Sequence, residues 1–248
     1  DRYLLLGDYR YKIFSMKLSE INNILSDELK NLENEMTQRA KTNVTLINEL
    51  SEHIIKSGGK RLRPIILMLT SKITSSEVSP NLIQVAVILE FIHAATLLHD
   101  DVVDMSEIRH SKDTANTIWG NKGAVLVGDF LYSRAFEMIV EIDDTKIYQI
   151  LAHTTNTIAQ GEVMQLMNIE NLEITEEEYM EIIYRKTAIL FEAAAKIGGV
   201  LSKENNESIE NLDIAIETIV DLFDEYNCLL YTSQSPRDQR GYRMPSSA

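Results

Sequence analysis

Proline and cysteine are both scarce in this chain of 248 residues. The four prolines are Pro64, Pro80, Pro236 and Pro245, so residues 81–235 contain none. Because proline lacks a backbone N–H and clashes with the preceding helical turn, this gap leaves room for long helices. The single cysteine excludes an intramolecular disulfide framework and a cysteine-rich zinc site. Such cysteine usage suits a reducing compartment, and we expect a cytoplasmic protein.

Positive charge and long apolar runs are also in short supply. Lys and Arg together number 24 against 38 for Asp and Glu, which gives a formal net charge of −14. A protein that follows a nucleic-acid backbone needs a basic face, so we expect no nucleic-acid partner. Even the apolar residues 124–130 are interrupted by Gly128 and Asp129. Because a membrane-spanning helix needs about 18 to 20 apolar residues, we expect no transmembrane segment.

Apolar residues recur at helical spacing through most of the chain. Ile21, Ile24 and Leu25 begin one such pattern, and apolar residues are densest in residues 85–92. Spacings of three and four place side chains on one face of a helix. The pattern predicts an all-α fold of about eight helices with buried central helices. Helix breaks are expected at residues 57–59, 75–80, 119–123, 143–144, 168–175, 198–199 and 203–208.

A single domain is expected from residue 17 to residue 227, because no linker-like composition interrupts it. Residues 1–16 lack the charged, apolar and small-residue order of a signal peptide, and we expect a leader or a disordered segment. Residues 228–248 are polar and contain three Arg and one Asp. Since they show no helical period, we expect a disordered, non-native tail there.

An acidic cluster ends the apolar central segment. Residues 99–104 read His-Asp-Asp-Val-Val-Asp, and about 100° of rotation per helical residue places Asp100 and Asp104 on one face, with Asp101 to the side. Carboxylates this close repel one another unless a cation lies among them. Hard oxygen ligands suit Mg²⁺, which often carries phosphate oxygens as well. A solvated acidic helix end is the alternative interpretation.

Two basic segments flank the acidic cluster in the sequence. Residues 58–64 read Gly-Gly-Lys-Arg-Leu-Arg-Pro, so two flexible glycines precede three cations at a helix start. This segment predicts a diphosphate cradle rather than a P-loop, because the P-loop spacing and a preceding strand are missing. Exposed basic residues at a helix start are the alternative. Residues 109–112, Arg-His-Ser-Lys, add cations beyond the acids, which suits an anionic ligand bridged by a metal.

Five segments, in this order and spacing, resemble the trans-type polyprenyl diphosphate synthases. They are residues 58–64, 91–104, 114–116, 128–131 and 186–187, and the resemblance covers about residues 18–210. Residues 118–121, 161–166 and 190–194 are most similar to the bacterial octaprenyl-type enzymes of quinone side-chain synthesis. The resemblance implies an isoprenoid synthase bundle of helices around a central cavity. It also implies a prenyltransferase that condenses isopentenyl diphosphate with an allylic diphosphate, Mg²⁺ as cofactor, and a homodimer.

The resemblance assigns the allylic diphosphate to the acidic cluster. Asp100 and Asp104 would be the metal ligands, with Asp101 orienting them from the side. The remaining contacts to this diphosphate would come from Arg109, Lys186 and Thr187. An allylic cation would then form in an apolar cavity. No protein nucleophile is needed for such a reaction.

The resemblance assigns isopentenyl diphosphate to the basic segments. Its site would be formed by Lys60, Arg63 and His93, with a contact from His110. Gln165 is a further expected substrate-binding residue, not assigned to either substrate. Relatives usually carry a second Arg at the position of His110, so this contact is expected to be weaker here. Ala95 and Thr96 are small, and they would leave the tunnel open for a long, roughly octaprenyl, chain.

Two other interpretations stay open. The dipeptide His99-Asp100 also occurs in metal-dependent phosphohydrolases of the HD type, although that reading leaves residues 58–64 unexplained. The second interpretation is a non-catalytic synthase-like subunit or fragment. The second acidic motif of the family is degraded here to Asp221, Asp224 and Glu225. Because the chain also ends soon after it, we expect a synthase that lacks its C-terminal helices and whose activity is impaired.

Overall fold

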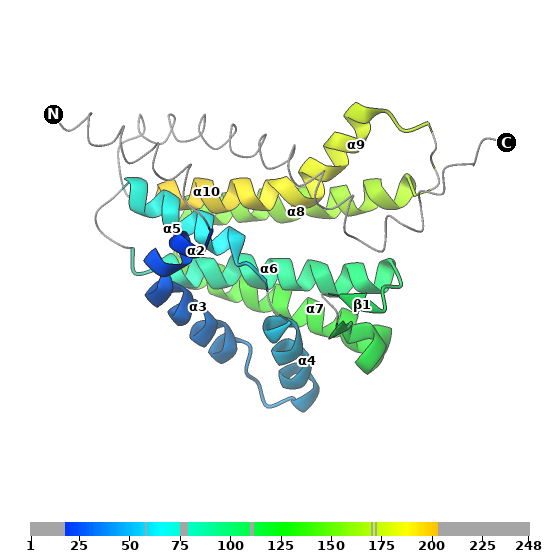
Figure 1. Cartoon of the computed structure of the whole chain (residues 1–248), viewed down its shortest axis with the longest axis horizontal. Coiled ribbons are helices and arrows are strands. Elements are labelled where there is room, and N and C mark those ends of the chain that lie inside the picture. Colours follow the sequence, from blue (N-terminus) through cyan, green and yellow to red (C-terminus); the bar gives the residue numbers. More distant parts are fainter. Residues whose placement is uncertain are drawn as a thin grey trace.

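Helices make up nearly all of the computed structural model, which describes residues 18–57, 59–74, 79–109, 112–169, 171 and 173–202 (Figure 1). The α-helices are α2 (Leu18–Ile24), α3 (Ser26–Arg39), α4 (Thr45–Lys56), α5 (Leu62–Thr74), α6 (Leu82–Val103), α7 (Ala115–Ile142), α8 (Thr145–Met167), α9 (Glu176–Ile183) and α10 (Ile189–Leu201). A π-helix, η1 (Tyr184–Ala188), joins α9 to α10. A short antiparallel hairpin pairs β1 (Ile108–Arg109) with β2 (Lys112–Asp113). The all-α prediction is confirmed, with this hairpin as the one exception among the described residues.

The central helix of the bundle is α6, which is apolar on every side. It packs against α7 along its length and also contacts α3, α5 and α10. In Figure 1, α8 and α10 lie side by side in a layer above α6 and α7, and α5 contacts both layers. By length and composition α6 could cross a membrane, but 67% of its most apolar window is buried inside the protein. The apolar stretch of α6 thus belongs to the core of the bundle. It was not considered when no transmembrane segment was expected from residues 124–130.

The breaks expected at residues 57–59, 75–80, 143–144 and 168–175 separate helices in the structure, whereas the gap between α3 and α4 and the hairpin between α6 and α7 were not expected. The break expected at residues 119–123 is present as a kink within α7, where Gly120 has the non-helical angles φ 77° and ψ 160°. The break expected at residues 198–199 is wrong. α10 continues through residues 198–199 to Leu201. A Cβ added at Gly198 would lie 1.9 Å from the Thr70 hydroxyl oxygen, so this glycine lets α10 approach α5 closely. Gly120 thus interrupts the helix, whereas Gly198 allows close packing of a helix that continues past it.

Several expectations lie outside the residues that the structure describes. They are the leader at residues 1–16, the tail at residues 228–248, the break at residues 203–208, His110, and the degraded acidic motif with Asp221, Asp224 and Glu225. The domain boundaries at residues 17 and 227 therefore stay predictions. The other site residues named above lie within the described ranges.

Candidate active site

The acidic cluster lies at the C-terminal end of α6. Asp100 and Asp101 are in its last turn, and Asp104 is its C-cap residue. The Asp104 N–H donates to the Asp100 carbonyl at 2.8 Å, which keeps these residues one helical turn apart on the same face. Met105 follows with a positive φ of 51°, so the chain leaves the helix directly after the third acid.

Asp101 is 2% exposed and is paired with Arg109 of β1. Arg109 Nε lies 3.2 and 3.1 Å from the two carboxylate oxygens, and Nη2 lies 2.9 Å from Oδ1. A planar guanidinium matches a carboxylate in this forked geometry. The Asn116 side-chain amide also donates to the Asp101 carbonyl at 3.2 Å. The pair therefore ties the hairpin to the end of α6.

Asp100 faces a different cation, Lys186 of η1. Lys186 Nζ lies 3.3 Å from both Asp100 carboxylate oxygens and 2.6 Å from Glu162 Oε2 on α8. Three helical segments thus bring two carboxylates and one ammonium group together. Glu162 was not among the residues assigned from the sequence. Its only signal there was its place in residues 161–166, the segment that is similar to the octaprenyl-type enzymes.

Three consecutive residues of α8 hold the π-helical turn that carries Lys186. Gln160 Oε1 accepts a hydrogen bond from Arg185 Nη1 at 2.7 Å, and Glu162 accepts one from Lys186. Between them, Gly161 allows close approach, since an added Cβ would lie 2.8 Å from both Arg185 Cβ and the Lys186 backbone nitrogen. π-Helical turns are rare and occur frequently at functional sites. The packing of these three α8 residues against η1 therefore determines the position of Lys186.

The charges at this face are crowded. The pKa of Glu162 is raised from its usual 4.5 to about 7, first because burial disfavours the charged carboxylate and second because Asp100 repels it. Lys186 opposes this shift without cancelling it. Below about pH 7 Glu162 is therefore mostly protonated, and above it two carboxylates share one ammonium group.

A pH dependence of stability follows from Glu162. Between about pH 4.5 and 7 the folded chain keeps a proton on Glu162 that the unfolded chain releases, so stability from this group falls as pH rises through that window. Glu162→Gln should remove this loss. We expect the melting temperature of the variant, relative to the unaltered chain, to increase from pH 5 to pH 8 in buffer without divalent ions. Glu177→Gln, on the exposed surface of α9, is the control, and parallel melting curves for Glu162→Gln would contradict the assignment.

The three cations of the first basic segment have different surroundings. Lys60 is exposed. Arg63 is half-buried, and its guanidinium carbon lies 4.3 Å from the centre of the Phe191 ring of α10. Arg61 instead points inward to two carboxylates. Of these three cations, Arg61 is thus the one paired with two carboxylates of the protein.

The remaining residues assigned from the resemblance lie along α6, α8 and η1. His93, Thr96, Gln165 and Thr187 are half-buried. The Thr96 hydroxyl donates to the His93 carbonyl at 2.8 Å. Ala95 is 0% exposed, so within the described part of the chain its side chain faces packed core rather than an open tunnel.

His99 is directed away from the acids and toward α7. Its Nε2 lies 3.1 Å from the Val125 carbonyl oxygen and 3.4 Å from Asp129 Oδ1. The ring occupies space that only a glycine leaves, because a Cβ added at Gly128 would lie 2.4 Å from Nε2. An HD-type site requires this histidine to bind a metal together with Asp100. The orientation of His99 toward α7 argues against that interpretation.

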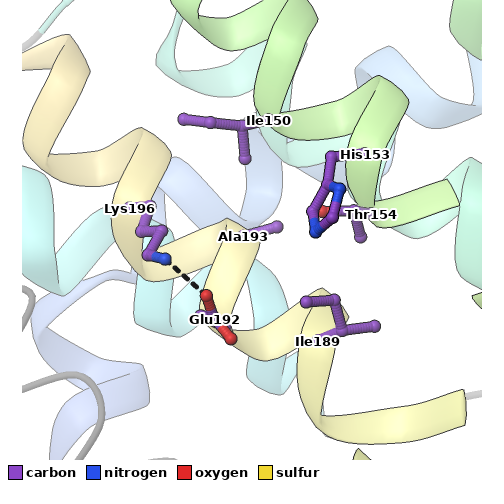
Figure 2. A pocket seen from close by; sticks show the side chains of 7 residues that line it. All are labelled: Ile150, His153, Thr154, Ile189, Glu192, Ala193 and Lys196. Atoms are coloured by element: carbon purple, nitrogen blue, oxygen red, sulfur yellow. Dashed lines mark hydrogen bonds and ion pairs between the residues drawn. The ribbon is translucent and has the colours of Figure 1, made fainter. Parts of the chain in front are cut away.

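A small pocket lies between α8 and α10, and it contains none of the residues assigned above. Figure 2 shows its seven lining residues: Ile150, His153, Thr154, Ile189, Glu192, Ala193 and Lys196. Lys196 Nζ donates to Glu192 Oε1 at 2.5 Å, and the other Glu192 oxygen accepts from the Tyr184 hydroxyl at 2.6 Å. With a volume of about 80 Å³, the pocket has room for a few water molecules but not for a prenyl chain.

Comparison with known proteins shows which family this chain resembles in sequence. Residues 44–224 match the family described as polyprenyl synthetase. The chain is 42% identical over 219 residues to the octaprenyl diphosphate synthase of Escherichia coli (strain K12), covering 86% of this chain and 67% of that protein. It is also 42% identical over 187 residues to the octaprenyl diphosphate synthase of Haemophilus influenzae, covering 75% of this chain and 56% of that protein. The chain thus spans between about half and two thirds of these relatives.

Solved structures give the same result. A decaprenyl diphosphate synthase from Rhodobacter capsulatus superposes with a TM-score of 0.81 at 32% identity, covering 90% of this chain and 70% of that one. A polyprenyl synthase from Caulobacter crescentus CB15, complexed with calcium and isoprenyl diphosphate, gives a TM-score of 0.76 at 40% identity, covering 80% and 60%. Sequence and fold therefore agree that the chain belongs to the polyprenyl synthetase family.

Proposed function

We propose that the protein is a prenyltransferase that condenses isopentenyl diphosphate with an allylic diphosphate to make a long-chain polyprenyl diphosphate. The observation that carries the proposal is the contact of Lys186 with Asp100, which joins the acidic end of α6 to η1. The octaprenyl and decaprenyl diphosphate synthases among the similar proteins support a long product. They also favour this function over an HD-type phosphohydrolase and a non-catalytic subunit.

The donor atoms at this face fit Mg²⁺. Asp100, Asp104 and Glu162 offer hard oxygen ligands, and burial together with the nearby charge of Asp100 raises the pKa of Glu162. In the described part of the chain, no three His, Cys, Asp or Glu side chains are placed to hold a metal by themselves. A Mg²⁺ ion held by Asp100 and Asp104 would take its other ligands from water and diphosphate oxygens. When bound, it would stabilise the negative charge of the departing diphosphate.

The side chains around this face have complementary tasks in the proposal. Lys186 donates hydrogen bonds to the allylic diphosphate, and the Thr187 hydroxyl assists it. Arg109, oriented by Asp101, contributes positive charge from the hairpin. The allylic C–O bond breaks with its electron pair leaving on the diphosphate, and the double bond of isopentenyl diphosphate attacks the resulting cation. The proton lost from the adduct goes to the released diphosphate.

The second substrate is assigned to the basic segment. Lys60 and Arg63 bind the diphosphate of isopentenyl diphosphate, and the stacking of Arg63 on Phe191 supports this by limiting its freedom. His93, His110 and Gln165 complete the proposed site. Thr96, which is small and half-buried, borders the path of the growing chain.

We further propose that two copies of the chain pair through α7. Ile118, Leu126 and Val140 on this helix are large apolar side chains that are about half to three quarters exposed. Large apolar side chains along one helix are typical of a surface that another protein covers. A homodimer also agrees with the family resemblance.

Binding and turnover assays on the 248-residue chain test the proposed function. Isothermal titration with farnesyl diphosphate should show binding that requires Mg²⁺. Labelled isopentenyl diphosphate should enter products longer than farnesyl only slowly, in keeping with the impaired activity expected above. Lys186→Gln should weaken the binding about 10- to 100-fold, because a hydrogen bond to a charged group contributes about 1.5–3 kcal/mol. Lys146→Gln, exposed on α8, is the matched control. Binding that ignores Mg²⁺ or Lys186 would overturn the proposal.

A further inference from the structure

We propose that Arg61 is a positioning residue, which holds the basic segment so that its neighbours Lys60 and Arg63 can bind isopentenyl diphosphate. The inference rests on the proposed function of that segment. In this inference Arg61 is the anchor, the residue that fixes the segment to the rest of the protein. Lys60 and Arg63 are the residues that bind the substrate. The family resemblance alone assigned no role to Arg61.

The backbone of Arg61 is in an unusual conformation. Its φ is 50°, in the left-handed region that side chains other than glycine rarely adopt. Its carbonyl accepts a hydrogen bond from the Ile65 N–H at 3.0 Å, so Arg61 also begins α5. A non-glycine residue keeps such a conformation only when its surroundings hold it there.

The guanidinium of Arg61 supplies that hold by joining three helices. Nε donates to Glu33 Oε1 of α3 at 2.6 Å, and Nη2 donates to the Ile55 carbonyl at the end of α4 at 2.9 Å. Nη1 donates to Glu90 Oε2 of α6 at 2.8 Å. The guanidinium therefore fixes the start of α5 against α3, α4 and α6, and it is not directed toward a ligand.

The buried partner makes this anchor specific. The Glu90 side chain is 5% exposed on the apolar α6, and the Arg61 side chain is 15% exposed. A buried carboxylate needs a partner that satisfies both its charge and its hydrogen bonds. Only arginine has a planar group with enough donors to bridge two carboxylates and a carbonyl at once. Lysine at this position would keep the charge but lose the bridge.

The position of Arg61 determines the positions of Lys60 and Arg63. With Arg61 turned inward, Lys60 lies exposed on the surface before α5. Arg63, in the first turn of α5, lies over Phe191 of α10, five residues after Lys186. The anchor therefore sets both proposed ligands of isopentenyl diphosphate relative to the helix that follows the allylic site.

Removal of the anchor should affect one substrate and spare the other. The variant is the double substitution Arg61→Met with Glu90→Gln, which leaves no unpaired buried charge, and Arg61→Lys serves as the conservative variant. Calorimetric affinity for isopentenyl diphosphate should fall about 10-fold or more in the double variant and less in Arg61→Lys. Affinity for the unreactive farnesyl thiodiphosphate with Mg²⁺ should stay within about twofold. The matched control is Arg39→Met, since Arg39 also bridges two carboxylates, Glu35 and Glu141, away from the site.

Hydrogen exchange separates this inference from the proposed function. Amides of residues 59–63 should exchange faster in the double variant than in the unaltered chain or in Arg39→Met. Equal losses for both ligands, or a lower melting temperature with unchanged affinity, would overturn the positioning role. If the unaltered chain fails to bind isopentenyl diphosphate, the proposed function of the segment fails. In that case the amide exchange rates of residues 59–63 alone test whether Arg61 holds the segment in place. Equal rates in the double variant and the unaltered chain would overturn that role.

Discussion

Asp100→Asn should lower Mg²⁺-dependent affinity for an allylic diphosphate at least about 100-fold without destabilising the fold. Asp100 contacts Lys186, which also contacts Glu162, and the charge of Asp100 adds to burial in raising the pKa of Glu162. Its removal eliminates a hard oxygen donor and also relieves repulsion of Glu162. We therefore expect a melting temperature that is equal or higher at pH 8. Calorimetry with farnesyl diphosphate, with and without Mg²⁺, measures the loss.

Asp101→Asn is the matched comparison, and it should behave in the opposite way. Asp101 is buried in its pair with Arg109, and breaking a buried ion pair costs about 3–5 kcal/mol of stability. Denaturant unfolding should detect this cost. Mg²⁺-dependent affinity should change less than in Asp100→Asn when both are compared below the unfolding transition. The proposed ligand set fails if Asp101→Asn loses as much Mg²⁺-dependent affinity as Asp100→Asn while remaining folded.

Gly161→Ala should disturb the site through the backbone. The added Cβ would lie 2.8 Å from the Lys186 nitrogen and from Arg185 Cβ, so α8 and η1 must move apart. Overpacking of this kind costs about 1–3 kcal/mol of stability. Because η1 carries Lys186, the movement should also weaken binding of the allylic diphosphate by about 10- to 100-fold, the size expected for a misplacement of roughly 1 Å.

Gly198→Ala is the control that distinguishes a loss of stability from a displacement of Lys186. Its Cβ would lie 1.9 Å from Thr70 Oγ1 and 2.7 Å from the Leu67 carbonyl oxygen, so the steric conflict is larger. These contacts join α10 to α5 and involve none of the proposed ligands. Unfolding free energy should fall in both variants, whereas affinity of the folded protein for the allylic diphosphate should fall only in Gly161→Ala. Similar affinity losses in the two variants would refute the positional role of Gly161.

Local sequence patterns predicted most of the helices but misread glycines at helix contacts. Apolar spacing identified the buried α6, and polar clusters located the break at residues 143–144. The pair Gly198-Gly199 was interpreted as a break because glycine disfavours helix. In the structure the absence of a side chain at Gly198 lets α5 pack closely against α10. A contact between helices that are far apart in the sequence cannot be read from a short stretch of sequence. The same limit applies to the π-helical turn, whose close contact is with α8.

The candidate site could be predicted in part because helical spacing alone places Asp100 and Asp104 on one face. Which cation meets which acid depends on packing between distant segments. Asp101 pairs with Arg109 eight residues later, while Asp100 meets Lys186 across the bundle. Glu162 and Arg61 escaped assignment because a charge in a sequence does not reveal whether its partner is a substrate or another side chain.

The contact of His99 with Gly128 has a consequence for anyone who recombines this protein with a relative. The imidazole ring fills the notch that the glycine leaves in α7 and reaches the Val125 carbonyl. A chimera that takes one helix from each parent must therefore carry the two residues as a unit. An alanine opposite the histidine would force the imidazole ring out of this space and away from the Val125 carbonyl. Crossover points are best placed so that residues 99 and 128 come from the same parent.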